Sequence, residues 1–157
     1  MCHPGGRPGC VLCDASLGPI VCRGEHWRLV LNRNQNLLGK CFLVARRHIE
    51  QVAELTEAEW ADLRREVARA TEALRLAFQP DHFNYAFLQN LERHVHLHVI
   101  PRYAERRTFA GLEFEDPDYP GHYAVPSPAR RLAQDKFELL AEKLREIAAG
   151  LAAGRRC

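Results

Sequence analysis

The stretch Arg93–Arg102, RHVHLHVIPR, carries histidines at positions 94, 96 and 98, and an apolar residue follows each of them. Successive side chains of a β-strand point to opposite faces. The alternation therefore predicts a strand with its histidines on one face and its apolar residues in the core. Neighbouring histidines would lie roughly 7 Å apart. A half-buried strand whose polar face consists of imidazoles indicates a site for metal binding or catalysis.

Two antiparallel hairpins are expected to supply the sheet around this strand. Residues 26–32 and 39–46 are rich in aliphatic and aromatic residues, and a polar segment that ends in Gly39 separates them. Residues 82–90 and 94–103 form the second predicted pair, joined by a short turn. All four segments would belong to one antiparallel sheet.

Two helices are expected to cover this sheet. Thr56 and Glu59 form a capping-box pattern at the start of a long apolar periodicity, and Pro80 ends it. A second apolar periodicity predicts a helix over residues 129–150. Residues 104–130, rich in glycine and proline, are predicted to form a long ordered loop. The order of elements predicts an α+β fold with an antiparallel sheet of about five strands and two helices packed on it.

The length of 157 residues predicts one domain over residues 10–150, with a flexible arm at 1–9 and a tail at 151–157. A hydrophobic fraction of 46% with 27% charged residues is typical of a soluble globular protein. The net charge of +2 does not indicate nucleic acid, and none is expected as a partner. No signal peptide or membrane-spanning run is visible, so we expect a cytoplasmic protein without a membrane partner.

Of the six cysteines, only Cys10 and Cys13 have a meaningful spacing, C-x-x-C. This motif is shared by zinc sites and redox pairs, but no strand-to-helix pattern of the thioredoxin type follows it. A zinc site would need two more ligands, for which His48 and His94 are the candidates. Together they would make a closed Cys₂His₂ site of the structural type. The alternative is a pair of reduced thiols without a metal.

The histidine row permits two kinds of chemistry. Three imidazoles in line along one strand do not easily converge on a single metal ion, although two of them could. A catalytic row does not require the three rings to converge on one point. Imidazole also suits this role, because its neutral form is a good nucleophile near neutral pH.

The segment HVHLHVI resembles the His-φ-His-φ-His-φ-φ signature of the histidine-triad (HIT) superfamily, where φ is apolar. The resemblance covers residues 10–103, including the hairpin LVLNRNQNLLGKCFLVARRHI and the segment NYAFLQN. It implies a homodimeric hydrolase or transferase that cleaves dinucleoside polyphosphates or nucleoside phosphoramidates, adenosine-type above all, at the α-phosphate. His96 would attack phosphorus and form a nucleotidyl-histidine intermediate, with His98 beside the phosphate. His94 would leave the row and join a structural zinc site, as in bacterial members that begin with C-x-x-C.

The same resemblance gives candidates for substrate binding. Asn32 matches an asparagine that contacts the ribose, and Asn90 is a candidate donor to the phosphate or the leaving group. Lys40 replaces a further histidine of some branches and is a candidate phosphate contact. Apart from the resemblance, Arg102 and the segment ERR at 105–107 form a small basic cluster that could draw in a polyphosphate chain.

The chain departs from the better-known branches just before the triad. They carry a Gly-rich loop with Gly-Gln-Ser/Thr, where this chain has only LER at 91–93. This departure leaves the leaving group open. Two other functions also stay open: a zinc-stabilised nucleotide-binding or interaction module with little turnover, and a hydrolase with a His₃ metal centre.

Overall fold

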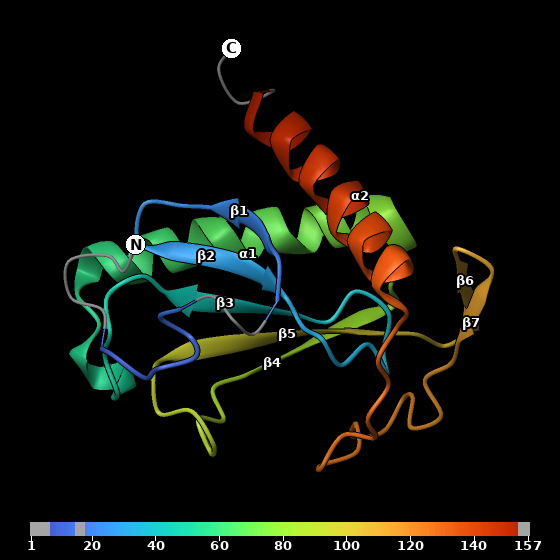
Figure 1. Cartoon of the computed structure of the whole chain (residues 1–157), viewed down its shortest axis with the longest axis horizontal. Helices are drawn as coiled ribbons and strands as arrows, with labels where there is room; N and C mark the ends of the chain where they lie inside the picture. The colour runs from blue at the N-terminus through green and yellow to red at the C-terminus, as the bar shows by residue number, and fades with distance from the viewer. Residues whose placement is uncertain (1–6, 15–17, 154–157) are drawn as a thin grey trace.

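A five-stranded antiparallel sheet forms the centre of the computed structural model, which describes residues 7–14 and 18–153 (Figure 1). Its spatial order is β1-β2-β3-β5-β4. The strands are β1 (Ile20–Arg23), β2 (Trp27–Leu31), β3 (Cys41–Ala45), β4 (His82–Ala86) and β5 (His96–Arg102). The predicted α+β fold with about five antiparallel strands is confirmed.

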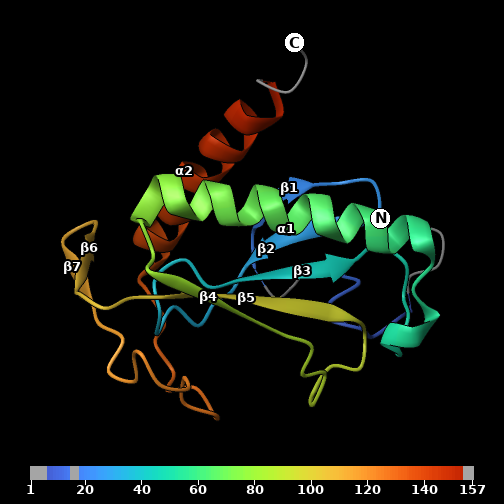
Figure 2. The same cartoon turned by 180° about the vertical axis from the view of Figure 1, so that it is seen from behind.

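Two helices pack on this sheet, as predicted. Helix α1 (Glu57–Phe78) follows a short 3₁₀ turn, η1 (Val52–Glu54), and lies along the back of the sheet (Figure 2). Helix α2 (Gln134–Ala153) crosses α1 and packs against β1. The capping box is present: the Thr56 hydroxyl accepts a hydrogen bond from the Glu59 amide at 3.2 Å, and the Glu59 carboxylate accepts one from the Thr56 amide at 2.8 Å.

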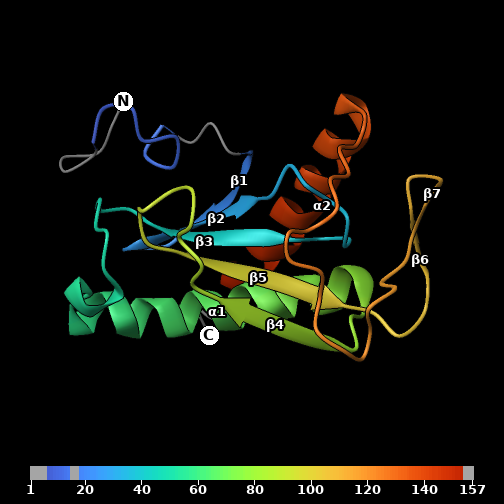
Figure 3. The same cartoon turned by 90° about the horizontal axis from the view of Figure 1, so that it is seen from below.

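The register of the strands divides the sheet into two chemically different faces. Leu43 pairs with Leu97, and both point into the core that the two helices close. Phe42 pairs with His98, and both point to the other face, because paired residues of an antiparallel ladder share a face. The segment 7–14 lies over part of this second face, on the side opposite α1 (Figure 3). Its residues Cys10 and Leu12 pack there in a small cluster completed by Val30, Phe42 and Val44.

The structure differs from the sequence-based expectations in five places. Residues 87–95 connect β4 to β5, where a short turn was expected. Strand β1 was not predicted, and His94 lies just before β5 rather than within it. The segment 104–130 contains a small separate hairpin of β6 (Arg107–Phe109) and β7 (Leu112–Phe114) instead of a loop alone. Helix α2 begins at Gln134, five residues later than the expected 129. Strands of three or four residues are too short to show an alternation that sequence periodicity can detect.

Within the described residues, no helix has the length and apolar character that crossing a bilayer requires. The expected arm 1–9 and tail 151–157 lie partly outside the described residues, so the division into arm, domain and tail stays a prediction.

Candidate catalytic and metal-binding sites

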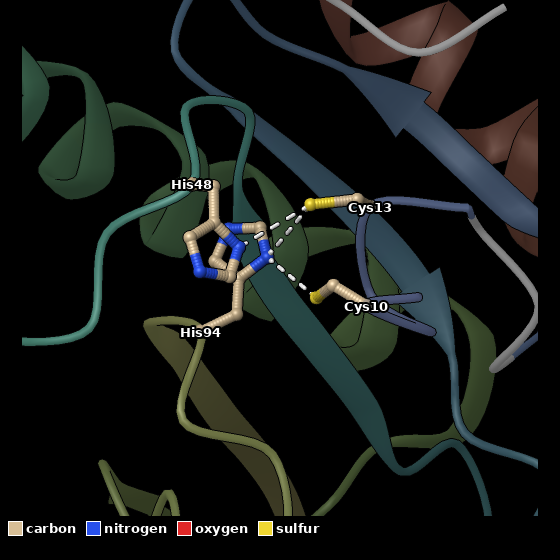
Figure 4. A group of neighbouring side chains, drawn as sticks. All are labelled: Cys10, Cys13, His48 and His94. Carbon is tan, nitrogen blue, oxygen red and sulfur yellow. Dashed lines mark hydrogen bonds between the residues drawn. The ribbon is translucent and has the colours of Figure 1, made fainter. Parts of the chain in front are cut away.

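Four predicted metal ligands, Cys10, Cys13, His48 and His94, come together at one end of the sheet (Figure 4). Their ligand atoms all lie within 4.8 Å of one another. The Cys13 sulfur lies 3.4 Å from His48 Nδ1 and 3.5 Å from His94 Nδ1, and the Cys10 sulfur lies 3.5 Å from His94 Nδ1. Tetrahedral zinc with ordinary bond lengths requires ligand atoms about 3.3–3.8 Å apart. The three sulfur–nitrogen separations fall within this range, so a set of two sulfurs and two imidazole nitrogens suits such an ion.

Hydrogen bonding and burial also prepare His94 to bind a metal. Its Nε2–H donates to the Arg47 carbonyl at 3.1 Å, which leaves the Nδ1 lone pair facing the sulfurs. Burial, and next the nearby His48, lower the pKa of His94 to about 4, so the ring is neutral near pH 7. The neutral ring is the form that binds a metal.

His96 and His98 lie on β5, on the face opposite the helices. Their ring centres are 5.0 Å apart, and the Phe42 ring lies edge-on to both, at 5.4 and 4.8 Å. His96 Nδ1–H donates to the His94 carbonyl at 2.8 Å, which leaves Nε2 with its lone pair. Burial lowers the pKa of His96. Burial, and next His96 and Lys40, lower the pKa of His98 to about 4. Both rings are therefore neutral near pH 7, as a nucleophilic imidazole must be.

Lys40 lies on the same face as this pair, close enough for its charge to lower the pKa of His98. It is only 4% exposed, its ammonium donates to the Asn36 side chain at 2.7 Å, and burial lowers its pKa to about 8. Lys40 is therefore mostly charged at pH 7 but can lose its proton just above that.

The loop between β2 and β3 depends on Gln35, which sequence reasoning did not single out. This side chain is fully buried and donates to the carbonyls of Asn32 and Lys40 at 2.6 and 3.0 Å. Its own oxygen accepts from the Gly39 amide at 2.8 Å. Gly39 has a φ of 84°, and a Cβ there would lie 2.8 Å from the Leu74 side chain, so the turn requires glycine. Gln35 thus holds the two predicted substrate residues of this loop in place. The sequence hints at this role of Gln35 only by placing an amide side chain in the polar segment between two apolar strands.

A pocket of about 520 Å³ includes in its lining Phe42, the residue whose ring contacts His96 and His98. Asn32 and Phe42 line it, together with Val11 from the segment between the two cysteines and residues 129–131 from the start of the C-terminal region. The Asn32 side-chain oxygen accepts from the Asn34 amide at 2.9 Å. The pocket is therefore connected to the histidine pair through Phe42 and to the metal-ligand segment through Val11.

The remaining two predicted substrate residues lie in different surroundings. Asn90 is exposed in the connection between β4 and β5. Arg102 is 2% exposed, and its guanidinium makes two bonds to Asp116, at 2.6 and 3.1 Å, and one to the Asn84 oxygen at 2.7 Å. The structure thus brings Lys40 close to the histidine pair and places Asn32 in the adjoining pocket, while the Arg102 guanidinium is engaged by protein groups.

Comparison with known proteins gives a family match. A family model described as "HIT domain" matches residues 18–105. The "Protein hit" of Bacillus subtilis (strain 168) is 28% identical over 113 residues, which cover 66% of this chain and 77% of that protein.

Several solved structures have a similar fold. A histidine triad protein from Marinobacter aquaeolei VT8 is 22% identical with a TM-score of 0.70, covering 87% of this chain and 93% of that one. A hypothetical histidine triad nucleotide-binding protein from Sulfolobus tokodaii strain7 is 21% identical with a TM-score of 0.68, covering 90% and 91%. A Zn-bound histidine triad family protein from Mycobacterium smegmatis is 19% identical with a TM-score of 0.64, covering 95% and 99%.

Proposed function

Because the chain belongs to the HIT domain family, we propose that it is a nucleotidyl hydrolase or transferase that forms a nucleotidyl-histidine intermediate. Family membership supports a nucleotide hydrolase or transferase in general. The finer proposal is cleavage of dinucleoside polyphosphates or nucleoside phosphoramidates at the α-phosphate. The observation that carries it is the hydrogen bond from His96 Nδ1 to the His94 carbonyl, because it leaves Nε2 free to attack.

The proposed reaction has two displacements at one phosphorus. In the first, the Nε2 lone pair of His96 forms a bond to phosphorus while the bond from phosphorus to the leaving group breaks and its electrons depart with that group. In the second, water attacks phosphorus and the P–N bond breaks, which returns the electron pair to Nε2 and releases a nucleoside monophosphate. His98 is positioned beside the phosphate to donate or accept a hydrogen bond. Positioning and charge stabilisation account for most catalysis of this kind.

The other predicted residues have roles that follow from their positions. The pocket lined by Asn32 and Phe42 would hold the nucleoside, with Asn32 at the ribose. The Lys40 ammonium would stabilise the negative charge that develops on the phosphate oxygens. Asn90 is proposed to contact the leaving group from the exposed connection before β5. Arg102 is proposed to act only indirectly, by positioning the residues around it through its bonds to Asp116 and Asn84.

We also propose that Cys10, Cys13, His48 and His94 hold a structural zinc ion, which would supply four ligand bonds that join the segment 7–14 to the sheet. This cluster favours one alternative function, a zinc-stabilised nucleotide-binding module with little turnover. It argues against a His₃ metal centre, because His94 Nδ1 faces the two sulfurs.

A homodimer in the cytoplasm is the proposed assembly and location. Strand β4 is an edge of the sheet, so among residues 7–14 and 18–153 no strand pairs with the outer side of its backbone. Trp60, Tyr85 and Leu88 are 43%, 46% and 38% exposed, and the Trp60 ring lies 6.4 Å from that of Phe87, just past the end of β4. A second copy that pairs along this edge would cover apolar surface as well as backbone. Light scattering on a sizing column would measure the mass, and a monomer at all concentrations would contradict the dimer.

Trapping the intermediate tests the proposed reaction. The protein is mixed with adenosine 5′-phosphoramidate or diadenosine tetraphosphate, quenched in acid-free denaturant and measured by intact mass. An AMP adduct that maps to His96 is expected. His26→Asn, which changes a half-exposed histidine just before β2 that belongs neither to the histidine pair nor to the metal-ligand cluster, is the matched control and should keep the adduct. An adduct that persists in His96→Ala would show that another residue is the nucleophile.

A further inference from the structure

A second pocket, of about 500 Å³, lies on the other side of the histidine pair from the pocket of Asn32. Its floor comes from β4 and the end of β5, and its wall comes from residues 119–123, which precede the start of α2. Nothing in the proposed function uses it. Its wall belongs to the segment 104–130, for which the sequence suggested no role.

The strand register connects this pocket to the histidine pair. Ala86 pairs with His98, and Asn84 pairs with Ile100. Paired residues share a face, so Ala86 and Asn84 point to the same side of the sheet as His98. Both line the pocket. Its floor thus begins beside His98 and continues to Arg102, roughly 13 Å along the strand at the usual rise per residue.

The wall of the pocket is fixed to the sheet by a buried ion pair. Arg102 on β5 binds Asp116 through two bonds, and the Asp116 carboxylate also accepts from the Tyr103 amide at 3.3 Å. The next carboxylate along the loop, Asp118, accepts from the Ala124 amide at 3.0 Å and closes the loop that carries the wall. The wall is therefore held in position without a ligand.

The chemistry of the wall favours a flat aromatic group. Tyr119, His122 and Tyr123 all line the pocket, and the rings of His122 and Tyr123 are stacked, with centres 4.6 Å apart and planes 24° apart. The Arg102 charge is neutralised by Asp116, which weakens any attraction for phosphate. Aromatic side chains stack well on nucleobases and similar rings.

We propose that this pocket binds the planar aromatic end of the leaving group, with Tyr119 and Tyr123 as the residues that select it. The assignment rests on the proposed function, because it takes the phosphorus to lie beside His96 and His98. The ring site lies several ångströms along β5 from the phosphorus, so a short amine cannot reach it. A polyphosphate chain that ends in a second nucleoside can, with its first nucleoside in the pocket of Asn32.

The test compares two substrates in the wild-type chain and four variants. Tyr123→Ala and Tyr119→Ala should each lower kcat/KM for diadenosine tetraphosphate about tenfold, the usual effect of removing one stacking partner. Neither should change kcat/KM for adenosine 5′-phosphoramidate, whose leaving group carries no ring. Tyr123→Phe keeps the ring and should retain the wild-type value. Leu139→Ala, at a position 48% exposed on α2, is the control for a surface change. An equal fall with both substrates, or no fall with either, would overturn the proposal.

Binding measurements separate this pocket from the proposed reaction. If neither substrate yields AMP and no adduct forms on His96, the proposed reaction fails. The dissociation constants of methylene-bridged, non-hydrolysable diadenosine tetraphosphate and adenosine tetraphosphate then decide the pocket. Binding about tenfold tighter with the second adenosine, lost in Tyr123→Ala, supports the pocket. Equal binding of the two compounds overturns it.

Discussion

His94 and His96 are two residues apart in the chain, and they bond to backbone carbonyls through different ring nitrogens. In His94, Nε2 is bonded to the Arg47 carbonyl, which leaves Nδ1 facing the sulfurs of Cys10 and Cys13. In His96, Nδ1 is bonded to the His94 carbonyl, which leaves the lone pair on Nε2. A backbone carbonyl therefore selects the tautomer in each case, and this selection divides identical side chains between metal binding and chemistry.

The two sites are also physically connected. The backbone carbonyl of His94 orients His96, while its side chain belongs to the metal-ligand cluster. Val11, which stands between the two cysteines, lines the pocket that would hold the nucleoside. A metal bound by the cluster would therefore hold both the orienting carbonyl and one wall of the substrate pocket. Four changes test how far the two sites can be separated.

His96→Ala should have the largest effect on turnover. Loss of a nucleophile from an arrangement of this kind costs about 10⁴-fold or more in kcat. Metal content and the thermal unfolding midpoint should stay close to wild type, because the metal ligands are untouched. Steady-state kinetics with adenosine 5′-phosphoramidate measure the turnover, and mass spectrometry measures the metal content. Activity within tenfold of wild type would mean that His96 is not the nucleophile, so the proposed division of roles between His94 and His96 would be wrong.

Cys13→Ser should have the next largest effect, and it should fall mainly on stability. A thiolate ligand is lost, bound zinc should fall to near zero, and the free energy of unfolding should drop by about 3 kcal/mol. For a chain of this size that is roughly 6–12 °C in the unfolding midpoint. Cys22→Ser is the matched control, since Cys22 lies on β1 outside the cluster. The comparison fails if Cys13→Ser keeps stoichiometric zinc, or if both variants lose the same stability.

Lys40→Met should have an intermediate effect that depends on pH. The pKa of Lys40 is lowered to about 8 by burial, so its charge is present below pH 8 and is lost as the pH rises through that value. Wild-type kcat/KM should therefore fall above about pH 8, whereas the acid limit should lie below the ordinary imidazole pKa, because burial lowers the pKa of the nucleophile His96. The variant should lose about 30-fold at pH 7 and show no alkaline fall. Lys40→Arg, which keeps a charge at all these pH values, should move the alkaline fall upward. An unchanged alkaline fall in Lys40→Met would assign it to another group.

The separation of His94 from His96 marks where sequence reasoning was sufficient and where it was not. The alternation of RHVHLHVIPR and the capping box at Thr56 predicted the main strand and helix, because both patterns are local. Local alternation could not show that the strand begins only at His96. The residue before it, Val95, donates its amide to the Ile49 carbonyl instead of to a neighbouring strand. That position depends on a segment far away in the chain.

Two further features were beyond the reach of sequence periodicity for the same reason. Gln35 supports the loop of Asn32 and Lys40 through bonds that exist only once the turn has closed. The aromatic wall at 119–123 is held by an ion pair between Arg102 and Asp116 across an irregular segment, which has no repeating pattern. The chemistry of the site was visible in residue types, whereas its supports were specified by tertiary contacts.

Val11→Ala should have the smallest effect, and it tests the connection itself. The side chain lines the nucleoside pocket but supplies no ligand atom, so zinc content and the unfolding midpoint should stay as in wild type. Loss of two methyl groups from a half-exposed wall should raise KM about threefold and leave kcat unchanged, because it weakens ground-state and transition-state binding alike. Leu139→Ala on α2 provides the control for a comparable truncation elsewhere. A fall in kcat with unchanged KM would mean that the segment between the cysteines acts on the orientation of His96 rather than on the nucleoside. An effect on zinc content would mean that Val11 supports the cluster and that the two sites cannot be separated at this residue.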